Sequence, residues 1–274
     1  MPSSYVGVRL RGGLGNRLFM LAAAFGQAES SGRTCCISGV EHNAHSDQRY
    51  EDTLFAAFER RTVDPFKPGV CHWIEPSNRC LCYDASLAGV PPETSVFMSG
   101  YFQNEKYLEG RKDAFVRLLR LPTQDVVRGA MFVHVRRGDY VGHAMHAVNL
   151  SLYFGRALAL ARATFGDRLR RILLFSDDPA WMESNKDAFC VGFLGEVVRE
   201  SDETVALARM AACELGGVCA NSSFSWWGAY LGFAPGKLVT FPDTWFNCPP
   251  SPDAGAGAYA DDIAFAGSVR VRVY

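Results

Sequence analysis

The second half of this chain alternates short apolar runs with helix-like segments, and this alternation limits the possible folds more than any other feature. Strands are predicted at 131–136, 171–176, 190–193, 196–198, 217–220 and 237–241. Helices are predicted at 151–165, directly after Pro179, at 202–215 and at 224–232. Strands and helices that alternate at this spacing are typical of a parallel, doubly wound sheet. The predicted fold class is therefore α/β.

The first half begins in a similar way, with a strand, a glycine-rich turn and a helix. The elements predicted there are a strand at 5–10, a helix at 17–31, a strand at 95–98 and a helix that ends near 119. Residues 41–95 are irregular, with scattered Pro, Asn, Asp and Cys, and are interpreted as short helices and loops over one sheet. Pro122 and its polar neighbours form the best linker candidate. We therefore expect two domains, 1–125 and 126–274.

The composition is that of an ordinary globular protein, with 48% hydrophobic and 21% charged residues among 274. The formal net charge is −1, whereas nucleic-acid-binding domains usually carry a basic excess, so no nucleic-acid partner is expected. No apolar run approaches the roughly 20 residues that span a bilayer, and the first residues lack a signal-peptide pattern. We expect a cytoplasmic protein without a transmembrane segment; a Golgi or other membrane-anchored form that has lost its anchor is the alternative.

The nine cysteines leave at least one thiol unpaired in a monomer, because their number is odd. Cys213 and Cys219 lie among apolar residues and are predicted to be small core residues. This usage favours a reducing compartment. A bridge from Cys71 to Cys80 or Cys82 is the main alternative.

Cationic side chains follow the apolar strand at 131–136. His134 ends the apolar run, and Arg136 and Arg137 come next, before Gly138 and Asp139. The carboxyl ends of parallel strands are where open α/β sheets bind ligands, and paired arginine forks match phosphate oxygens. This motif predicts a diphosphate site. The alternative is a surface pair of arginines beside an Arg-Gly-Asp turn.

Two other strand ends carry polar residues that fit the same site. Asp177 ends the strand at 171–176, where its carboxylate could accept hydrogen bonds from a base or ribose, or could cap the next helix; Asp178 is the better cap candidate. Ser222 and Ser223 open a helix whose first N–H groups form a neutral cradle for an anion. The tryptophans at 226–227 could stack on a sugar, although core packing is favoured for at least one of them.

The glycine-rich turn of the first half resembles a phosphate-binding loop without completing a known pattern. Gly13 and Gly15 let backbone N–H groups approach a ligand at the start of a helix. Leu18 stands where a dinucleotide fingerprint has its third glycine, which disfavours a Rossmann oxidoreductase. The histidines and carboxylates show no metal-ligand spacing, so no metal or other cofactor is expected. The charge of a departing diphosphate would then be met by Arg136, Arg137 and helix N–H groups.

Five motifs together resemble the α-1,2-fucosyltransferases of glycosyltransferase family 11. They are, in order along the chain, 12–19 (GGLGNRLF), 100–103 (GYFQ), 134–140 (HVRRGDY), 175–178 (FSDD) and 221–228 (NSSFSWWG). The resemblance implies a GT-B-type fold of two Rossmann-like α/β domains with a donor cleft between them. It also implies inverting, metal-independent transfer of L-fucose from GDP-β-L-fucose to a galactose-like hydroxyl of an oligosaccharide acceptor.

The resemblance also assigns roles to residues. Arg136 would contact the donor diphosphate, and Asn16 would face the reacting sugar. The remaining donor-binding residues would be Gly13, Gly15, His134, Arg137, Asp177, Ser222, Ser223 and Phe224. Asp139, Glu41 and Asp47 are the candidates for a base that activates the acceptor hydroxyl, and Asp139 is taken as the catalytic one.

The chain departs from the family at Arg17, and two other functions remain as alternatives. This chain has Arg17 where the family loop usually has Gln, which could change contacts with the acceptor. The nearest rival function uses another GDP-deoxysugar, such as GDP-rhamnose. An adhesion protein that displays Arg137-Gly138-Asp139 would need an exposed loop, whereas here the tripeptide follows a buried strand.

Overall fold

The computed structural model describes residues 4–43, 46–76, 81–85, 89–190, 192–246 and 263–273. The chain divides into two compact units, Met1–Arg120 and Leu121–Tyr274. The division falls next to Pro122, in the segment predicted to be the linker. Both units are α/β with parallel sheets, as predicted from the alternation of elements.

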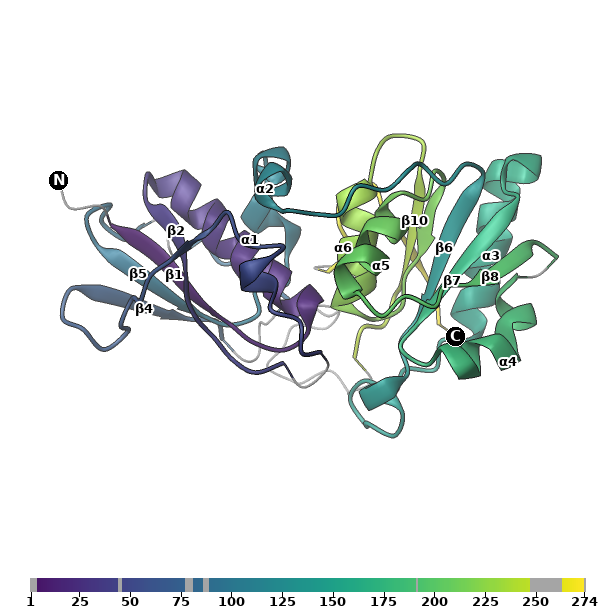
Figure 1. Cartoon of the computed structure of the whole chain (residues 1–274), viewed down its shortest axis with the longest axis horizontal. Helices are drawn as coiled ribbons and strands as arrows, with labels where there is room; N and C mark the ends of the chain where they lie inside the picture. Colours follow the sequence, from purple (N-terminus) through teal and green to yellow (C-terminus); the bar gives the residue numbers. More distant parts are fainter. Residues whose placement is uncertain are drawn as a thin grey trace. The chain divides into compact units, whose positions relative to one another are not determined.

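The first unit contains a five-stranded parallel sheet with strand order β3-β2-β1-β5-β4. Its strands are β1 (Tyr5–Leu10), β2 (Thr34–Val40), β3 (Glu59–Arg60), β4 (Val70–Ile74) and β5 (Ser95–Ser99). Its helices are α1 (Leu14–Ser31), α2 (Lys112–Leu118) and the 3-10 turns η1 (Tyr50–Asp52) and η4 (Glu105–Leu108). Figure 1 shows α1 running along the sheet beside β1 and β2.

Helix α1 can lie deep in the first unit because its residues are small or apolar. Its alanines are buried, and Gly26 meets the backbone of Tyr107 so closely that any Cβ would overlap the Tyr107 carbonyl oxygen. The helix ends at Gly32, whose φ of 65° is the left-handed conformation that glycine adopts without strain. The predicted helix begins three residues too late, because the glycine-rich turn itself enters the helix at Leu14.

The second unit contains a six-stranded parallel sheet with strand order β11-β10-β9-β6-β7-β8. Its strands are β6 (Ala130–Val135), β7 (Arg171–Ser176), β8 (Leu194–Val197), β9 (Gly216–Val218), β10 (Leu238–Pro242) and β11 (Val269–Val271). Its helices are α3 (Ser151–Phe165), α4 (Pro179–Cys190), α5 (Glu203–Ala211), α6 (Ser223–Gly232) and the short turns η5 (Gly138–Tyr140) and η6 (Gly166–Arg168).

Helices cover both faces of the second sheet, which explains why every residue of β6 is buried (Figure 1). Met131, Val133 and Val135 belong to a hydrophobic cluster with residues of α3 and α4. His134 has the opposite orientation, since side chains alternate along a strand, and its ring lies 5.7 Å from that of Phe224 in α6. The continuous apolar run of this strand is therefore the signature of a sheet buried on both sides.

The prediction was wrong in several elements. A strand at 190–193 was expected, but α4 continues to Cys190 and the strand begins at Leu194. Asp178 begins this helix by accepting a hydrogen bond from the Trp181 N–H at 3.0 Å, as predicted. Strands β2, β3, β4 and β11 were not predicted. Three of these, β3, β4 and β11, are partly exposed edge strands without a clear alternation.

The structure decides three predictions about tryptophan and cysteine side chains. Trp226 and Trp227 are both fully buried, so the alternative that they stack on a sugar is wrong. Cys71 and Cys82 are thiols, so a bridge between them is also wrong, whereas Cys80 lies outside the described residues. Cys213 and Cys219 are buried as predicted.

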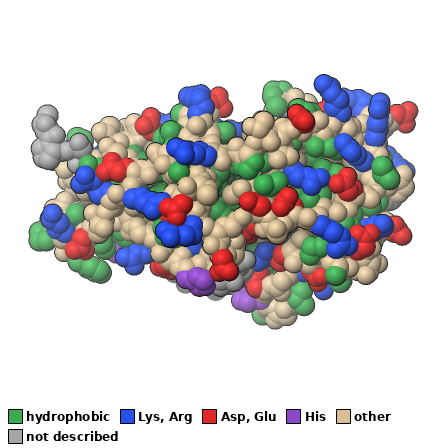
Figure 2. Space-filling view, in the orientation of Figure 1, with side chains coloured by type: hydrophobic (Ala, Val, Ile, Leu, Met, Phe, Trp, Pro, Cys, Tyr) green, Lys and Arg blue, Asp and Glu red, His purple; other side chains and the backbone are tan. Residues whose placement is uncertain are grey.

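Charges of both signs are mixed on the face of the described residues that Figure 2 draws. Acidic and basic side chains are interspersed over the face drawn in Figure 2, in keeping with the net charge of −1. Within the described ranges, no helix combines the length and the apolar character needed to cross a membrane.

Candidate active site

Polar side chains of the second unit meet where β6 and β7 end. The two strands pair in parallel, with Val135 opposite Ser176, so the residues that follow them are neighbours. Arg136 and Asp177 form an ion pair, with Nη1 of the arginine 3.1 Å from Oδ2 of the aspartate. The predicted meeting of these two side chains at one sheet edge is therefore a consequence of strand register.

Arg136 is held by two carboxylates. Its Nε and Nη2 atoms donate to Oδ1 of Asp139 at 3.2 and 2.6 Å, in addition to the Asp177 pair. Its guanidinium also lies 5.5 Å from the ring centre of Tyr140. A guanidinium has five N–H donors, so this grip fixes the plane of the group while leaving donors for an anion. Only 19% of the side chain is exposed, which strengthens its electrostatic interactions.

Arg137 points to a different set of partners, towards the start of α4. Its guanidinium lies 4.0 Å from the ring centre of Trp181, and Nε is 3.4 Å from Oδ2 of Asp178. Its backbone N–H donates to Oδ1 of Asp177 at 2.8 Å. Asp177 therefore accepts bonds from both arginines, through the side chain of one and the backbone of the other. This arrangement gives Asp177 an orienting role that the sequence did not reveal.

His134 is a neutral imidazole in this site. Burial, aided by the positive charge of Arg136, lowers the pKa of His134 to about 3, and only 3% of the residue is exposed. Its buried Nδ1 atom has no hydrogen-bond partner among the described residues. A buried imidazole nitrogen is costly to leave unpaired, so it is a natural contact for a bound ligand. A neutral His134 can orient or hydrogen-bond a ligand but cannot serve as an acid at neutral pH.

The start of α6 supplies backbone donors close to His134. Ser222 is the N-cap in an extended conformation, and its side chain makes no capping hydrogen bond. Ser223 and Phe224 occupy the first turn, whose N–H groups have no helical carbonyl to bond. Together with the positive end of the helix dipole, these groups suit a phosphate.

Asn221 anchors this turn, a role that sequence reasoning missed. Its Nδ2 atom donates to the backbone carbonyls of His146 and Trp245, at 3.1 and 3.0 Å. The side chain thus ties the start of α6 to two other loops. Its place directly after the predicted strand at 217–220 was the only sequence signal for this function.

The glycine-rich turn of the first unit leads from β1 into α1. Gly12 has a φ of 70°, and Gly13 is the N-cap of α1. Gly15 lies in the first turn of the helix, and the next residue, Asn16, accepts a hydrogen bond at Oδ1 from Nε2 of Gln103 at 2.7 Å. The structure thus brings the fifth residue of the motif 12–19 into contact with the fourth residue of the motif 100–103 within this unit.

Arg17 is part of the framework of this turn. It is 2% exposed, and it donates from Nε to the Gly12 carbonyl at 2.8 Å and from Nη2 to the Glu41 carbonyl at 2.6 Å. A side chain so buried does not reach an acceptor, so the expected effect on acceptor contacts is replaced by a structural one. The predicted base candidates Glu41 and Asp47 are exposed, and Asp139 is engaged by Arg136.

Solved structures of other proteins share the fold of this chain. Fucosyltransferase NodZ from Bradyrhizobium matches 84% of this chain and 94% of its own, with a TM-score of 0.50 and 14% identity. POFUT1 in complex with GDP-fucose matches 88% of this chain and 99% of its own, with a TM-score of 0.51 and 12% identity. Such low identities establish the fold alone, which is that of the GT-B class of glycosyltransferases.

Sequence comparison gives the family. The profile of Glycosyl transferase family 11 matches residues 77–249, and the chain belongs to this family of glycosyltransferases. An alpha-1,2-colitosyltransferase of Escherichia coli is 25% identical, with 89% of this chain and 93% of the relative covered. The galactoside 2-alpha-L-fucosyltransferase of Caenorhabditis elegans is 26% identical, with 80% and 66% covered.

Proposed function

We propose that this protein transfers L-fucose from GDP-β-L-fucose to a galactose-like sugar hydroxyl, with inversion and without a metal ion, to give an α-1,2 linkage. The observation that carries the proposal is Arg136, held between Asp177 and Asp139 two residues after His134, whose ring lies 5.7 Å from that of Phe224 in the first turn of α6. The name of the Caenorhabditis elegans relative supports the donor and the linkage. The acceptor is proposed to be an oligosaccharide.

The chemistry asks the protein to stabilise a leaving nucleoside diphosphate. Negative charge grows on the phosphate oxygens as the bond to the sugar breaks, and a prearranged donor to such charge contributes roughly 3–4 kcal/mol. Arg136 supplies a fixed positive charge, and the N–H groups at the start of α6 supply neutral donors. Neutral His134 adds a hydrogen-bonding nitrogen without adding charge.

Asp139 is proposed as the base that activates the acceptor hydroxyl, but its carboxylate also binds Arg136. In the structure its Oδ1 atom accepts two bonds from Arg136. To act as a base, the Asp139 carboxylate would have to separate from Arg136. The donor diphosphate would take its place on Arg136, so donor binding would free the base. Asn16 of the first unit is proposed to face the reacting sugar, with Gly13 and Gly15 giving the backbone room to approach it.

Titration of GDP with and without EDTA tests the donor assignment. Wild type should bind GDP equally well in both conditions, and Arg136→Ala should weaken binding by at least tenfold, since a charged hydrogen bond contributes about 1.5–3 kcal/mol. Arg199→Ala is the matched control, because Arg199 is an exposed arginine of the same unit paired with Glu183. Equal GDP affinity for Arg136→Ala and wild type would refute the assignment.

A second candidate function uses a different activated deoxysugar. One relative is named an alpha-1,2-colitosyltransferase, and GDP-rhamnose is the further alternative. Competition between GDP-fucose and each rival donor in a single transfer assay separates these functions, because the true donor should dominate product formation at equal concentrations.

A further inference from the structure

An unusual turn follows β5 in the first unit. Phe102 has a φ of 52°, a left-handed conformation that bulky side chains rarely adopt, and it is fully buried. Gly100 precedes it at a point where a Cβ would overlap the side chain of Glu75. A strained backbone of this kind persists only when its surroundings hold it, and it often marks a functional position.

Glu75 is the residue that holds this turn. It follows β4, which pairs with β5, and its own N–H donates to the Ser99 carbonyl at 2.8 Å. One carboxylate oxygen accepts from the Tyr101 N–H at 2.6 Å, and the other accepts from the Phe102 N–H at 2.9 Å. Both oxygens are thus used to hold two consecutive backbone amides.

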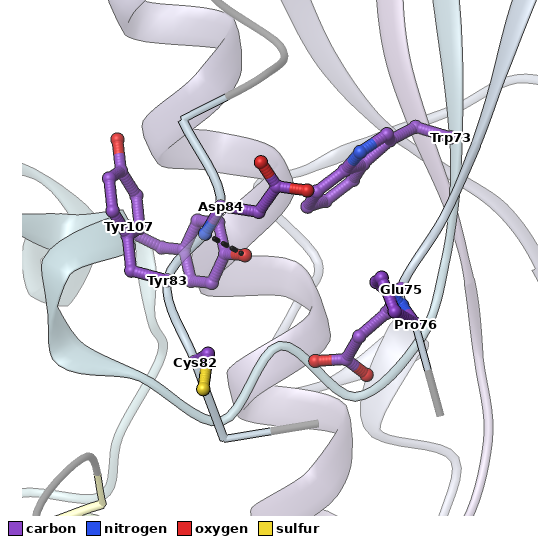
Figure 3. A pocket seen from close by; sticks show the side chains of 7 residues that line it. All are labelled: Trp73, Glu75, Pro76, Cys82, Tyr83, Asp84 and Tyr107. Atoms are coloured by element: carbon purple, nitrogen blue, oxygen red, sulfur yellow. Dashed lines mark hydrogen bonds between the residues drawn. The ribbon is translucent and has the colours of Figure 1, made fainter. Parts of the chain in front are cut away.

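Aromatic stacking locks the turn from another side. The ring of Phe102 stacks on Trp73 of β4, with centroids 4.9 Å apart and planes inclined by 14°. Figure 3 shows Trp73 and Glu75 lining one small hollow with Tyr83, Asp84 and Tyr107. Aromatic rings therefore line part of the space beside the carboxylate.

The turn delivers Gln103 to the glycine-rich loop. Gln103 directly follows Phe102, and its Nε2 atom donates to Oδ1 of Asn16 at 2.7 Å. This bond fixes which end of the Asn16 amide faces Gln103, so the amide nitrogen of Asn16 faces the other way. The contacts form a continuous path from Glu75, through the backbone of the turn, to the side chain proposed to face the reacting sugar.

We propose that Glu75 is a positioning residue for glycosyl transfer. In its ionised form, and only in that form, Glu75 holds the turn at 100–103 in place, so that Gln103 fixes the amide of Asn16. The inference rests on the proposed function of the Asn16 loop. Protonation of Glu75 turns one acceptor oxygen into an O–H, which faces a backbone N–H and breaks half of the clamp.

The surroundings of Glu75 bring its protonation close to neutral pH. Burial raises the pKa of Glu75 to about 7, against the lowering effects of the two backbone hydrogen bonds and of Arg11. Among the described residues, the titratable and charged groups around it are Arg11 of the glycine-rich loop, Cys82, Tyr83 and Asp84 of the segment beside it, and Tyr107 of η4. Transfer should therefore fall as the pH drops below about 7.

Stability should move in the opposite direction, which separates positioning from a loss of fold. A pKa raised in the folded state means that folding favours the protonated carboxyl. The contribution of Glu75 to stability is therefore complete below its unfolded pKa and is lost as the pH rises through about 7. Acidification from pH 8 to pH 6 should reduce transfer while the Glu75 contribution to stability improves.

The experiment compares wild type, Glu75→Gln and Glu214→Gln over pH 6 to 8. It measures fucose transfer from GDP-fucose, GDP binding and the thermal midpoint. Wild-type transfer should be about tenfold lower at pH 6 than at pH 8, because about one carboxylate in ten stays ionised one unit below its pKa. Glu75→Gln, which mimics the protonated side chain, should have a low kcat throughout, no limb near pH 7, and unchanged GDP binding.

Glu214→Gln is the matched control, since Glu214 also accepts a backbone N–H, that of Gly129 at 2.6 Å, but in the second unit. It should keep the wild-type limb. A flat wild-type profile, or a Glu75→Gln variant with more than half of wild-type transfer at pH 8, overturns the inference. If Glu75→Gln does not fold, the wild-type protein alone tests the inference. Its rate of transfer and its thermal midpoint are then compared over the same pH range. Failure of the proposed function is distinct, because wild type would then transfer no fucose at any pH.

Discussion

Gly138 is the most revealing position to perturb in the proposed donor site. It lies between Arg137 and Asp139, and a Cβ placed there would approach Oδ2 of Asp177 well inside the 3.0 Å limit that real Cβ contacts respect. The φ of Gly138 is not in the left-handed range, so alanine is tolerated by the backbone itself. Gly138→Ala therefore acts by moving the carboxylate of Asp177.

The size of the effect follows from what Asp177 holds. Moving its carboxylate weakens the 3.1 Å pair with Arg136 and the 2.8 Å bond from the Arg137 N–H. Misplacing a catalytic group by about 1 Å can cost about 100-fold in rate, or about 2.7 kcal/mol in the barrier. We expect Gly138→Ala to lower kcat/KM by about 100-fold. The thermal midpoint should stay nearly unchanged, because the site follows the carboxyl ends of β6 and β7.

Steady-state transfer assays and thermal unfolding check this prediction. Gly142→Ala is the matched control: its φ of 81° strains an alanine, but no atom lies within 4 Å of the new methyl group. That variant should lose stability of the order of 1 kcal/mol and keep its activity. In an Asp177→Ala background, Gly138→Ala should add little, as coupled sites do. Activity of Gly138→Ala within twofold of wild type would refute the reasoning.

Two further predictions concern the second unit. Tyr153→Phe should destabilise this unit by about 1–3 kcal/mol, since the buried hydroxyl bonds the Cys219 carbonyl at 2.6 Å and the Thr240 carbonyl at 2.9 Å; urea denaturation measures the loss, and an unchanged midpoint would contradict it. The His134 imidazole should show no titration between pH 5 and 8 in NMR spectra of the free protein, because burial lowers its pKa to about 3; a midpoint near 6.5 would show that the ring is solvated.

The sequence predicted that Arg136 and Asp177 lie close together, because local patterns determine the positions of both side chains. A fully apolar run predicts a strand buried on both faces, and parallel pairing then brings Arg136 and Asp177 to one edge. The serines that open α6 are similarly found by their place after a buried strand. These inferences need only strand ends and residue chemistry, which are both readable along the chain.

The partners of these side chains were less predictable, because they depend on distant contacts. Glu75 lies in a segment that the sequence suggested was irregular, yet it joins β4 to the turn after β5. The burial of Arg17 likewise depends on the Glu41 carbonyl, which follows a strand that was not predicted. Tertiary packing determines where edge strands and buried charged side chains lie, so local sequence patterns predict them poorly.

The most direct test of the account is transfer of labelled fucose from GDP-fucose to a galactoside in the presence of EDTA, with wild type and Arg136→Ala side by side. We expect an α-1,2-linked product that forms equally with and without EDTA, and a loss of at least 100-fold in the variant. A product that requires a divalent cation, or a variant that keeps half of the wild-type rate, would contradict it.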